Sequence, residues 1–372
     1  MRITKLLITG GPCSGKTTIK PFLKKELENR GFAVIFVPEV ATDIILAGPH
    51  PETLPKPEML EWQNLALKTQ LIYEDKIYRE LAELTARLKN ADQVVMICDR
   101  GTLDGAVYIS KDMFGALLKR NDLNWVSGRD LRYEAIFHLV TAADGAEKFY
   151  NKDNPARTET LDEAKMYDGL TKETYLGHPH QRIIDNSSDF EGKRRRLLAK
   201  VLRALGVPQK LEIERKFLLR QFPDFKKFPV TVQPIKITQH YIGEHGRIRI
   251  RCRAQDGEGI ACYRTEKINT DRPDISIELE NLISNEEYMG HFRELNSRFD
   301  AISKTRHYFI WKNQVFELDI FHEPDRLQGL ALLEIELDDE SDKVELPDWL
   351  GPLVEVTGDK KFKNRQMAKR PQ

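Results

Sequence analysis

The sequence has few cysteines, and none of them has a metal-binding spacing. Four cysteines occur among 372 residues, and no C-x-x-C pair is present. This composition excludes a disulfide-rich secreted module and a zinc-finger domain. We expect Cys13, Cys98, Cys252 and Cys262 to be free thiols in a reducing compartment.

Long apolar runs and an excess of one charge are also missing. The apolar run at residues 6–9 is too short for a signal peptide, and no stretch approaches the roughly 20 apolar residues of a membrane-spanning helix. The 58 basic and 58 acidic residues cancel, so we expect no nucleic-acid partner and only local electrostatic functions. These features predict a cytoplasmic protein, and its oligomeric state stays open. The length allows two domains.

The first half of the chain alternates buried strands with helices. Strands are predicted at 5–9, 33–37, 94–98 and 135–140, and helices at 16–30, 57–88 and 192–205. Buried strands joined by helical crossovers indicate an α/β domain with a parallel sheet. We place this domain at residues 1–205 and a linker at 206–210.

The second half, residues 211–372, changes to a period of two, which is typical of antiparallel strands. We expect one helix there, at 286–302. Eight strands are predicted, at 211–218, 235–242, 247–253, 261–268, 275–280, 304–311, 315–321 and 332–338. The fold class is therefore α/β followed by α+β.

A phosphate-binding loop follows the first strand and opens the first helix. The match to G-x-x-x-x-G-K-[ST] consists of Gly10, Gly11, Pro12, Cys13, Ser14, Gly15, Lys16 and Thr17. The glycines allow backbone N–H groups to surround phosphates, and the helix N-terminus adds positive potential. Lys16 would reach the β- and γ-phosphates and Thr17 would hold Mg²⁺, with Thr18 next to it in the nucleotide site.

Two acids end the neighbouring strands of this domain. Glu39 follows the second strand, and Asp99 follows the third. Ligands bind at the carboxyl ends of strands in open α/β sheets. Asp99 could carry Mg²⁺ through a water or act as a base, and Glu39 could accept a proton from an acceptor hydroxyl. The alternative for both is an ordinary surface acid at a strand end.

The first half resembles AAA-type P-loop ATPases related to nicotinamide riboside kinases. The resemblance covers about residues 1–205 and rests on the loop, Pro38-Glu39, Asp99-Arg100-Gly101, Arg157-Thr158-Glu159 and His178-Pro179 through Asp185-Asn186. It implies that Arg157 belongs to a lid over the phosphates, with Arg129 and Arg132 as further lid candidates. An N-K-x-D motif is absent, since residues 151–154 lack its final Asp, so ATP is favoured over GTP.

Alternation in the second half places charged residues on one face of the predicted sheet. Arg247, Arg249, Arg251 and Arg253 form one row, and pairs of acids stand two residues apart on other strands. The ordinary alternative is a sheet with one solvated face. Four arginines in a row need an anion, however, and paired glutamates need a cation. A closed barrel around a metal-bound polyphosphate meets both requirements.

These charged positions are similar to those of the CYTH family, the triphosphate tunnel metalloenzymes, over about residues 210–365. The signature is E-x-E-x-K at Glu212, Glu214 and Lys216, followed by R-x-R and a late E-x-E. The resemblance implies an eight-stranded antiparallel barrel with a charged tunnel. The implied ligands of Mg²⁺ or Mn²⁺ are Glu212, Glu214, Glu334 and Glu336. The implied phosphate-binding residues are Lys216, Arg249, Arg251, Lys267 and Arg306. Asp319, Glu317 or Glu280 would position the attacking water.

The leading hypothesis is a bifunctional enzyme acting on nucleotides and triphosphates. Its second half would hydrolyse tripolyphosphate, thiamine triphosphate or a nucleoside triphosphate. Its first half would bind and hydrolyse ATP, with GTP left open, or phosphorylate a small acceptor. The alternative is a nucleotide-dependent trafficking switch whose tunnel binds anionic or phosphoinositide headgroups, with the basic segments 193–196 and 360–363 touching lipid.

Overall fold

The computed structural model describes residues 1–151, 153, 158–207, 211–269, 275–337, 339 and 342–371. It describes the backbone alone for six of these residues: Glu52, Leu211, Glu212, Asn269, Ile275 and Ser276. The chain divides into two compact units, Met1–Val201 and Leu202–Gln372, which are treated separately below. Across the described ranges, no helix combines the length and the apolar character needed to cross a membrane.

The first unit is built on a five-stranded parallel sheet with the order β2-β3-β1-β4-β5. The strands are β1 (Arg2–Gly10), β2 (Ala33–Val37), β3 (Gln93–Asp99), β4 (Ala135–Leu139) and β5 (Gln181–Ile184). The parallel α/β prediction is confirmed. The strand β5 was not predicted, because its four residues include Gln181 and Arg182 and carry no apolar run.

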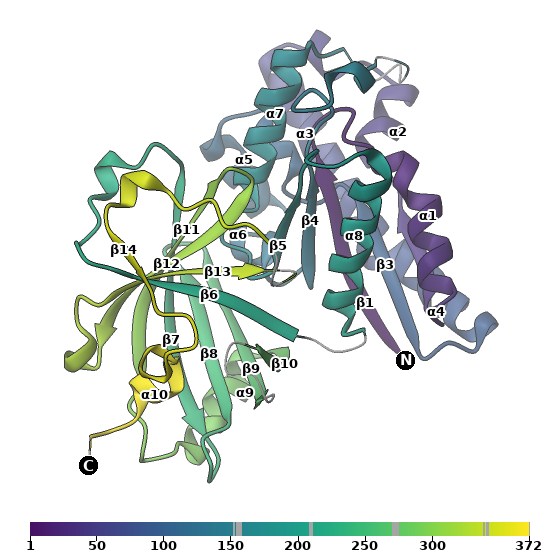
Figure 1. Cartoon of the computed structure of the whole chain (residues 1–372). Helices are drawn as coiled ribbons and strands as arrows, with labels where there is room; N and C mark the ends of the chain where they lie inside the picture. The colour runs from purple at the N-terminus through teal and green to yellow at the C-terminus, as the bar shows by residue number, and fades with distance from the viewer. Residues whose placement is uncertain are drawn as a thin grey trace. The chain divides into compact units, whose positions relative to one another are not determined.

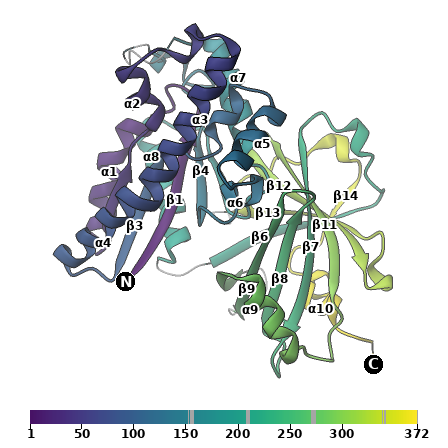
Figure 2. The ribbon, with the colours of Figure 1, turned by 180° about the vertical axis from the view of Figure 1, so that it is seen from behind.

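Helices cover both faces of this sheet. In Figures 1 and 2, α1 and α8 lie on one face, and α3 and α4 lie on the other. The helices are α1 (Lys16–Glu28), α2 (Val40–Ala47), α3 (Lys56–Ile72), α4 (Tyr78–Lys89), α5 (Lys111–Arg120), α6 (Trp125–Arg129), α7 (Leu161–Thr174) and α8 (Phe190–Leu205). One π-helical turn, Tyr73–Ile77, joins α3 to α4, so the long helix predicted at 57–88 is nearly continuous.

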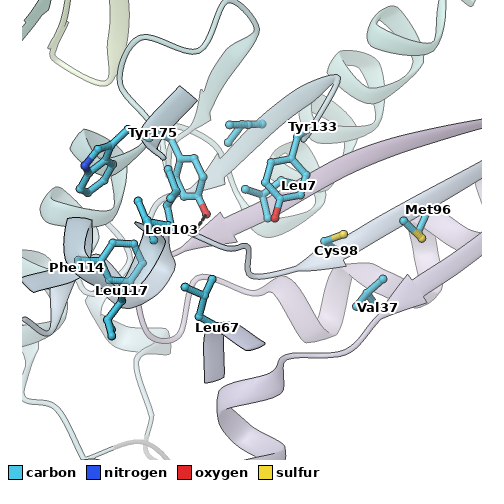
Figure 3. Close-up of a cluster of buried hydrophobic side chains, with 13 residues drawn as sticks. Leu7, Val37, Leu67, Met96, Cys98, Leu103, Phe114, Leu117, Tyr133 and Tyr175 are labelled. Carbon is cyan, nitrogen blue, oxygen red and sulfur yellow. Dashed lines mark hydrogen bonds between the residues drawn. The ribbon is translucent and has the colours of Figure 1, made fainter. Parts of the chain in front are cut away.

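A buried cluster lies beneath the segment that follows β3 (Figure 3). Leu7, Cys98, Leu103 and Phe114 belong to it and are almost completely buried. The hydroxyl of Tyr175 points at the backbone of Leu103 and accepts its N–H at 3.2 Å. This packing fixes the backbone that carries the polar residues after β3.

The second unit contains a nine-stranded antiparallel sheet with the order β10-β9-β8-β7-β11-β12-β13-β6-β14. Residues 275–277 of β10 also pair with residues 211–213 of β6. The strands are β6 (Leu211–Leu219), β7 (Val232–Ile242), β8 (Ile248–Gln255), β9 (Gly259–Asn269), β10 (Ile275–Ile283), β11 (Ile302–Trp311), β12 (Gln314–Glu323), β13 (Ala331–Leu337) and β14 (Leu353–Glu355). The antiparallel sheet that alternation predicted is present, and β14 is an additional short strand.

The apolar face of this sheet packs under side chains from the loops. Phe217, Phe309, Phe316 and Leu333 form a fully buried core, against which the half-buried ring of Trp349 packs. The opposite face carries the charged residues, of which Lys216, Arg249, Arg306, Asp319 and Glu334 are buried and Arg251, Glu280 and Glu336 are partly buried. The alternative of a solvated charged face is therefore wrong at these buried positions, whereas Ile268 of β9 and Leu279 of β10, on the other face, are exposed.

The helix predicted at 286–302 is wrong over most of its length. The helix α9 covers Asn285–Gly290, a 3₁₀ turn covers His291–Glu294, and Ile302 already belongs to β11. The Asn296 side-chain amide instead donates to the carbonyls of Gly243 and Glu244, at 2.8 and 2.9 Å. Such a local side-chain contact with the backbone competes with helix formation.

The expectation of four free thiols is also wrong. Cys252 on β8 and Cys262 on β9 are direct partners in the antiparallel register and form a disulfide, with Cα atoms 4.2 Å apart. Directly opposed residues on neighbouring strands bring their Cβ atoms close together. Sequence spacing did not indicate this pair, because the register of the hairpin decides it. Cys13 and Cys98 are free.

Candidate functional sites

The phosphate loop connects β1 to α1 at the centre of the parallel sheet. Gly10 has φ +146°, and a Cβ there would lie 2.1 Å from the carbonyl oxygen of Leu139. Gly15 has φ +92° and Cys13 has φ +56°. Positive φ angles at these positions let the backbone turn so that N–H groups point into one concavity, which is how such loops bind anions.

Lys16 folds back over this loop. Its Nζ donates to the carbonyls of Gly10 and Gly11, at 3.2 and 3.5 Å, and to Ser14 Oγ at 3.3 Å. Burial, together with the charge of Arg100, lowers the pKa of Lys16. The ammonium group is therefore held in the concavity that the sequence assigned to phosphate.

Glu39 is part of a partly buried ion-pair group at the end of β2. Arg100 donates from Nε to Glu39 Oε1 at 3.0 Å and from Nη1 to Asp104 Oδ1 at 3.2 Å. Burial alone would raise the pKa of Glu39, but Arg100 and Lys16 outweigh it and lower that pKa to about 2. Arg100 has φ +70°. A positive φ is uncommon for a residue other than glycine, and such residues cluster at functional sites.

Asp99 lies at the end of β3, and its two carboxylate oxygens differ in their contacts. Lys20 Nζ lies 2.5 Å from Oδ2. Oδ1 is buried and accepts no hydrogen bond from the part of the chain that the structure describes. A buried carboxylate oxygen without a partner is costly, and a bound cation or water would satisfy it.

Asp168 of α7 is a residue of this site that the sequence did not reveal. Its Oδ1 accepts the N–H groups of Gly11 and Thr141, both at 2.9 Å, and lies 3.0 Å from His138 Nε2. Although burial opposes ionisation, His138 and Lys172 lower the pKa of Asp168. The Asp168 carboxylate therefore fixes the backbone of the phosphate loop at Gly11 and that of the neighbouring segment at Thr141.

A pocket of about 120 Å³ opens beside Glu39 and Arg100. Its apolar wall includes Trp62, Leu67 and Phe114. Among the described residues the Trp62 indole N–H is buried without a hydrogen-bond partner. The charged residues of the described lining are Glu39, Asp104, Glu159 and Arg100, so the acids outnumber the single arginine.

The charged face of the second unit contains a continuous chain of buried ion pairs. Lys216 Nζ lies 2.7 Å from Glu334 Oε1, and Arg306 Nη2 lies 2.7 Å from Glu334 Oε2. Arg306 also binds both oxygens of Asp319, each at 2.7 Å, and contacts Glu317. Opposite charges hold one another in a low-dielectric interior.

A second group of charges lies on β8, β9 and β10. Arg251 Nη2 donates to Glu280 Oε2 at 2.7 Å, and Lys267 Nζ lies 2.8 Å from Glu278 Oε1. Arg249 lies 3.6 Å from Glu278 and 3.7 Å from Glu280. The structure thus brings Lys216, Arg249, Arg251, Lys267, Arg306 and Asp319 to one face, each beside an opposite charge.

Three of the four predicted metal ligands have described side chains. Glu336 pairs in register with Glu214, and Glu334 pairs with Lys216. The side chain of Glu212 lies outside the described residues. Among described side chains, no group of three or more acids, histidines or cysteines is already arranged to hold a metal. The donors that are present are carboxylates, the oxygen ligands that Mg²⁺ and Mn²⁺ prefer.

Comparison with known families assigns the first unit. A family model described as an AAA domain matches residues 5–193, which is half of the chain. The chain belongs to this AAA-domain family.

The chain is also similar to inorganic triphosphatases. An inorganic triphosphatase from Acetivibrio thermocellus is 38% identical over 71 residues, which are 19% of this chain and 43% of that protein. The chain therefore spans less than half the length of this curated relative. A crystal structure of an inorganic triphosphatase is 29% identical over 42% of this chain and 93% of its own, with a TM-score of 0.29. A crystal structure of a hypothetical protein is 30% identical over 42% and 97%, also with a TM-score of 0.29.

Two of the predicted lid residues, Arg129 and Arg132, contact residues of the domain's interior instead of forming a lid. Arg129 is 1% exposed and donates to Asp130 and to the carbonyl of Leu176. Arg132 pairs with Glu74 and Asp75, each at 2.8 Å. Both arginines are structural, and these two lid candidates are wrong. Arg157 lies outside the described residues.

The basic run 193–196 of the AAA domain has one buried member and three arginines that contact other side chains. Arg195 pairs with Glu191 and Arg196 with Asp185, while the Arg194 guanidinium lies over the ring of Phe22. Lys193 is buried. Lys193 therefore cannot contact headgroups, and contact through the three arginines stays a prediction.

Proposed function

We propose that the chain is a two-domain phosphate enzyme. The second unit hydrolyses a triphosphate with Mg²⁺ or Mn²⁺, and the AAA domain binds ATP with Mg²⁺ and transfers its terminal phosphate. The family match and the similarity to inorganic triphosphatases support an enzyme that acts on phosphates. We assign the triphosphatase similarity to the second unit, because the AAA-domain match ends at residue 193.

One observation carries the triphosphatase proposal: buried cations and buried acids lie side by side on one face of the same sheet. Lys216, Arg306 and Asp319 are all below 8% exposed. Burying so many charges is costly unless they serve a ligand that is itself highly charged. A structural ion-pair network is the competing explanation, and it does not require turnover.

A closed barrel fits this arrangement. The pairing of β10 with β6 joins the first strand of the sheet order to the eighth, and eight strands enclose an interior that side chains fill. In such a barrel the charged face is the inner face. A linear triphosphate would lie along it, with Lys216, Arg249, Arg251, Lys267 and Arg306 binding its oxygens.

The carboxylates of this face suit a metal-binding and water-positioning role. Glu214, Glu334 and Glu336, with Glu212, would hold the ion, which supplies charge neutralisation and a more acidic bound water. Asp319 is already held by Arg306 and Lys304. Glu317 lies opposite Glu334, and burial raises the pKa of Glu317. We assign Glu317 the water-positioning role, because a raised pKa suits proton transfer.

In the AAA domain, Oδ1 of Asp99 accepts no hydrogen bond within the described ranges and suits a hydrated Mg²⁺ that Thr17 would also hold. Lys16 would bind the β- and γ-phosphates. Glu39, with a pKa of about 2 and a tight bond to Arg100, is a weak base. We therefore assign Asp99 to the hydrated Mg²⁺ and Glu39 to the orientation of Arg100.

The pocket beside Glu39 supports transfer to a small acceptor more than simple ATP hydrolysis. It combines an apolar wall with the polar side chains of Glu39 and Arg100 and with the indole N–H of Trp62, which has no partner among the described residues. Its described lining has an acidic excess, which disfavours an anionic acceptor. The acceptor is accordingly a neutral or cationic molecule that carries a hydroxyl group.

The test is phosphate release by the full chain from tripolyphosphate, thiamine triphosphate, ATP and GTP, each with Mg²⁺, with Mn²⁺ and with EDTA. Metal-dependent release from at least one triphosphate, abolished by EDTA, is expected. Stoichiometric binding of tripolyphosphate without any release would instead favour a headgroup-binding switch, the competing hypothesis.

A further inference from the structure

Lys193 is the buried member of the basic run in α8. Its side chain is almost fully covered, at 3% exposure. The ammonium donates to the carbonyls of Val140 at 2.6 Å and Ser14 at 3.2 Å, and to Asn186 Oδ1 at 2.7 Å. A lysine ammonium has three donors, so these three oxygens match its capacity. One of them belongs to the phosphate loop itself.

Lys193 completes a set of donors that hold successive carbonyls of the loop. Thr141 Oγ1 donates to the carbonyl of Pro12, and the Ala142 N–H donates to that of Cys13 at 3.1 Å. Lys193 holds the next carbonyl, that of Ser14. Of the three donors, Lys193 alone carries a charge.

Holding a carbonyl fixes the direction of the N–H that follows it. A trans peptide is planar, and its C=O and N–H point to opposite sides. When Lys193 draws the Ser14 carbonyl toward α8, the Gly15 N–H therefore points away from α8. By the same argument, Thr141 and Ala142 orient the N–H groups of Cys13 and Ser14.

We propose that Lys193 is a positioning residue of the nucleotide site: its ammonium turns the Gly15 N–H toward bound phosphates and adds a positive charge behind the loop. This inference rests on the proposed nucleotide binding by the AAA domain. Its consequence is that affinity for a nucleoside triphosphate depends on the protonation of Lys193. A neutral amine loses the charge and one of the three donors.

The titration of Lys193 falls within an accessible range. Burial lowers the pKa of Lys193 to about 8. The charged groups that face it are Asp168 of α7, Asp185 after β5, Arg196 of its own helix and Lys16 of the loop. The protonated form predominates below that pKa, so affinity is highest there and falls as the pH rises through it. A bound polyphosphate favours the ammonium form and raises the pKa of Lys193.

The experiment measures the dissociation constants of MgATP and MgGTP on the full chain by calorimetry, from about pH 7 to about pH 9.5. Wild type is compared with Lys193→Met, Lys193→Arg and a matched control, Arg195→Met, which removes an exposed charge from the same helix. We expect wild-type affinity to fall about tenfold across the range, as for the loss of a charge-assisted hydrogen bond. Lys193→Met should bind weakly at every pH, and Arg195→Met should follow wild type.

Lys193→Arg keeps its charge at all these pH values and should lose the decline. Because arginine is larger and this variant could pack poorly, the ¹⁵N shift of Lys193 Nζ is also titrated in wild type, with and without MgATP. A pKa that rises on binding supports the proposal. Two results would overturn it: a decline that persists in Lys193→Arg, which would point to Lys16, or a Lys193→Met affinity within twofold of wild type. No binding to wild type at any pH would reject the proposed nucleotide site itself.

Discussion

Lys216 on β6 and Glu334 on β13 lie opposite each other in the antiparallel register, with Nζ 2.7 Å from Oε1. The pKa of Lys216 lies above the ordinary lysine value. Burial opposes this shift, but Glu214 and Glu334 stabilise the charged form and outweigh burial. The same contact lowers the pKa of Glu334. The phosphate-binding role proposed for Lys216 and the metal-binding role proposed for Glu334 therefore meet at one pair of side chains.

Breaking this pair should destabilise the second unit. Lys216→Met leaves Glu334 with Arg306 as its remaining close cation, and removal of one partner from a buried ion pair costs about 3–5 kcal/mol. Hydrogen–deuterium exchange resolved by peptide measures the loss in each unit separately. Lys236→Met is the control, because its pair with Asp256 is exposed and should contribute less than about 1 kcal/mol. The two variants behaving alike would contradict a buried charged face.

Coupling between the two partners gives a second prediction. The double variant Lys216→Met/Glu334→Gln should be less destabilised than the sum of the single variants, by about 1 kcal/mol or more. Each single variant leaves one charged partner of the pair buried, whereas the double variant removes both charges. Glu334→Gln alone isolates the remaining term of the cycle. Strict additivity in the same exchange measurement would mean that the two side chains do not interact.

The pKa of Glu39 predicts an acid-sensitive contribution to the stability of the AAA domain. Its folded pKa of about 2 lies below the ordinary value of 4.5. The stabilisation is therefore present above about pH 4.5 and is lost as the pH falls toward 2, to a total of at most about 3 kcal/mol. Glu39→Gln should be less stable than wild type at pH 7, and the difference should vanish in acid. A difference that stays constant with pH would show that Arg100 does not stabilise the carboxylate.

The pocket predicts a separation between acceptor and nucleotide binding. Trp62→Phe keeps the apolar wall but removes the indole N–H that faces no partner among described residues. In a screen of neutral and cationic hydroxyl compounds that accelerate ATP turnover, this variant should raise the acceptor KM about tenfold and leave the ATP KM unchanged. Leu65→Ala, at an exposed position of the same helix, is the control. An equal change in both KM values would place Trp62 outside an acceptor site.

Residues with periodic or motif signals were predictable from the sequence, and residues defined by register or by distant packing were not. Buried strands alternating with helices predicted the parallel sheet, the motif at Gly10–Thr17 predicted the phosphate loop, and the alternation around Arg249 and Arg251 predicted the antiparallel sheet and its charged face. Asp168 reaches Gly11 across 157 positions of sequence, and no local pattern indicates such a contact.

Lys193 was misjudged for a related reason. It stands first in a run of four basic residues, and a run reads as surface charge, yet the helical periodicity of α8 turns this one residue inward. Cys252 and Cys262 are likewise joined by the register of β8 and β9, which their spacing does not reveal. The short strand β5 and the segment after Gly290 depend on tertiary contacts.

The central claim is that one chain carries two separate phosphate sites, and reciprocal variants test it most directly. Phosphate release from tripolyphosphate and from ATP is measured with Mg²⁺ for wild type, Glu214→Gln and Lys16→Ala. The account predicts that Glu214→Gln loses tripolyphosphate hydrolysis and retains Lys16-dependent ATP turnover. Lys16→Ala should show the reverse. Loss of both activities in either variant, with the fold of each unit intact by hydrogen exchange, would contradict two independent sites.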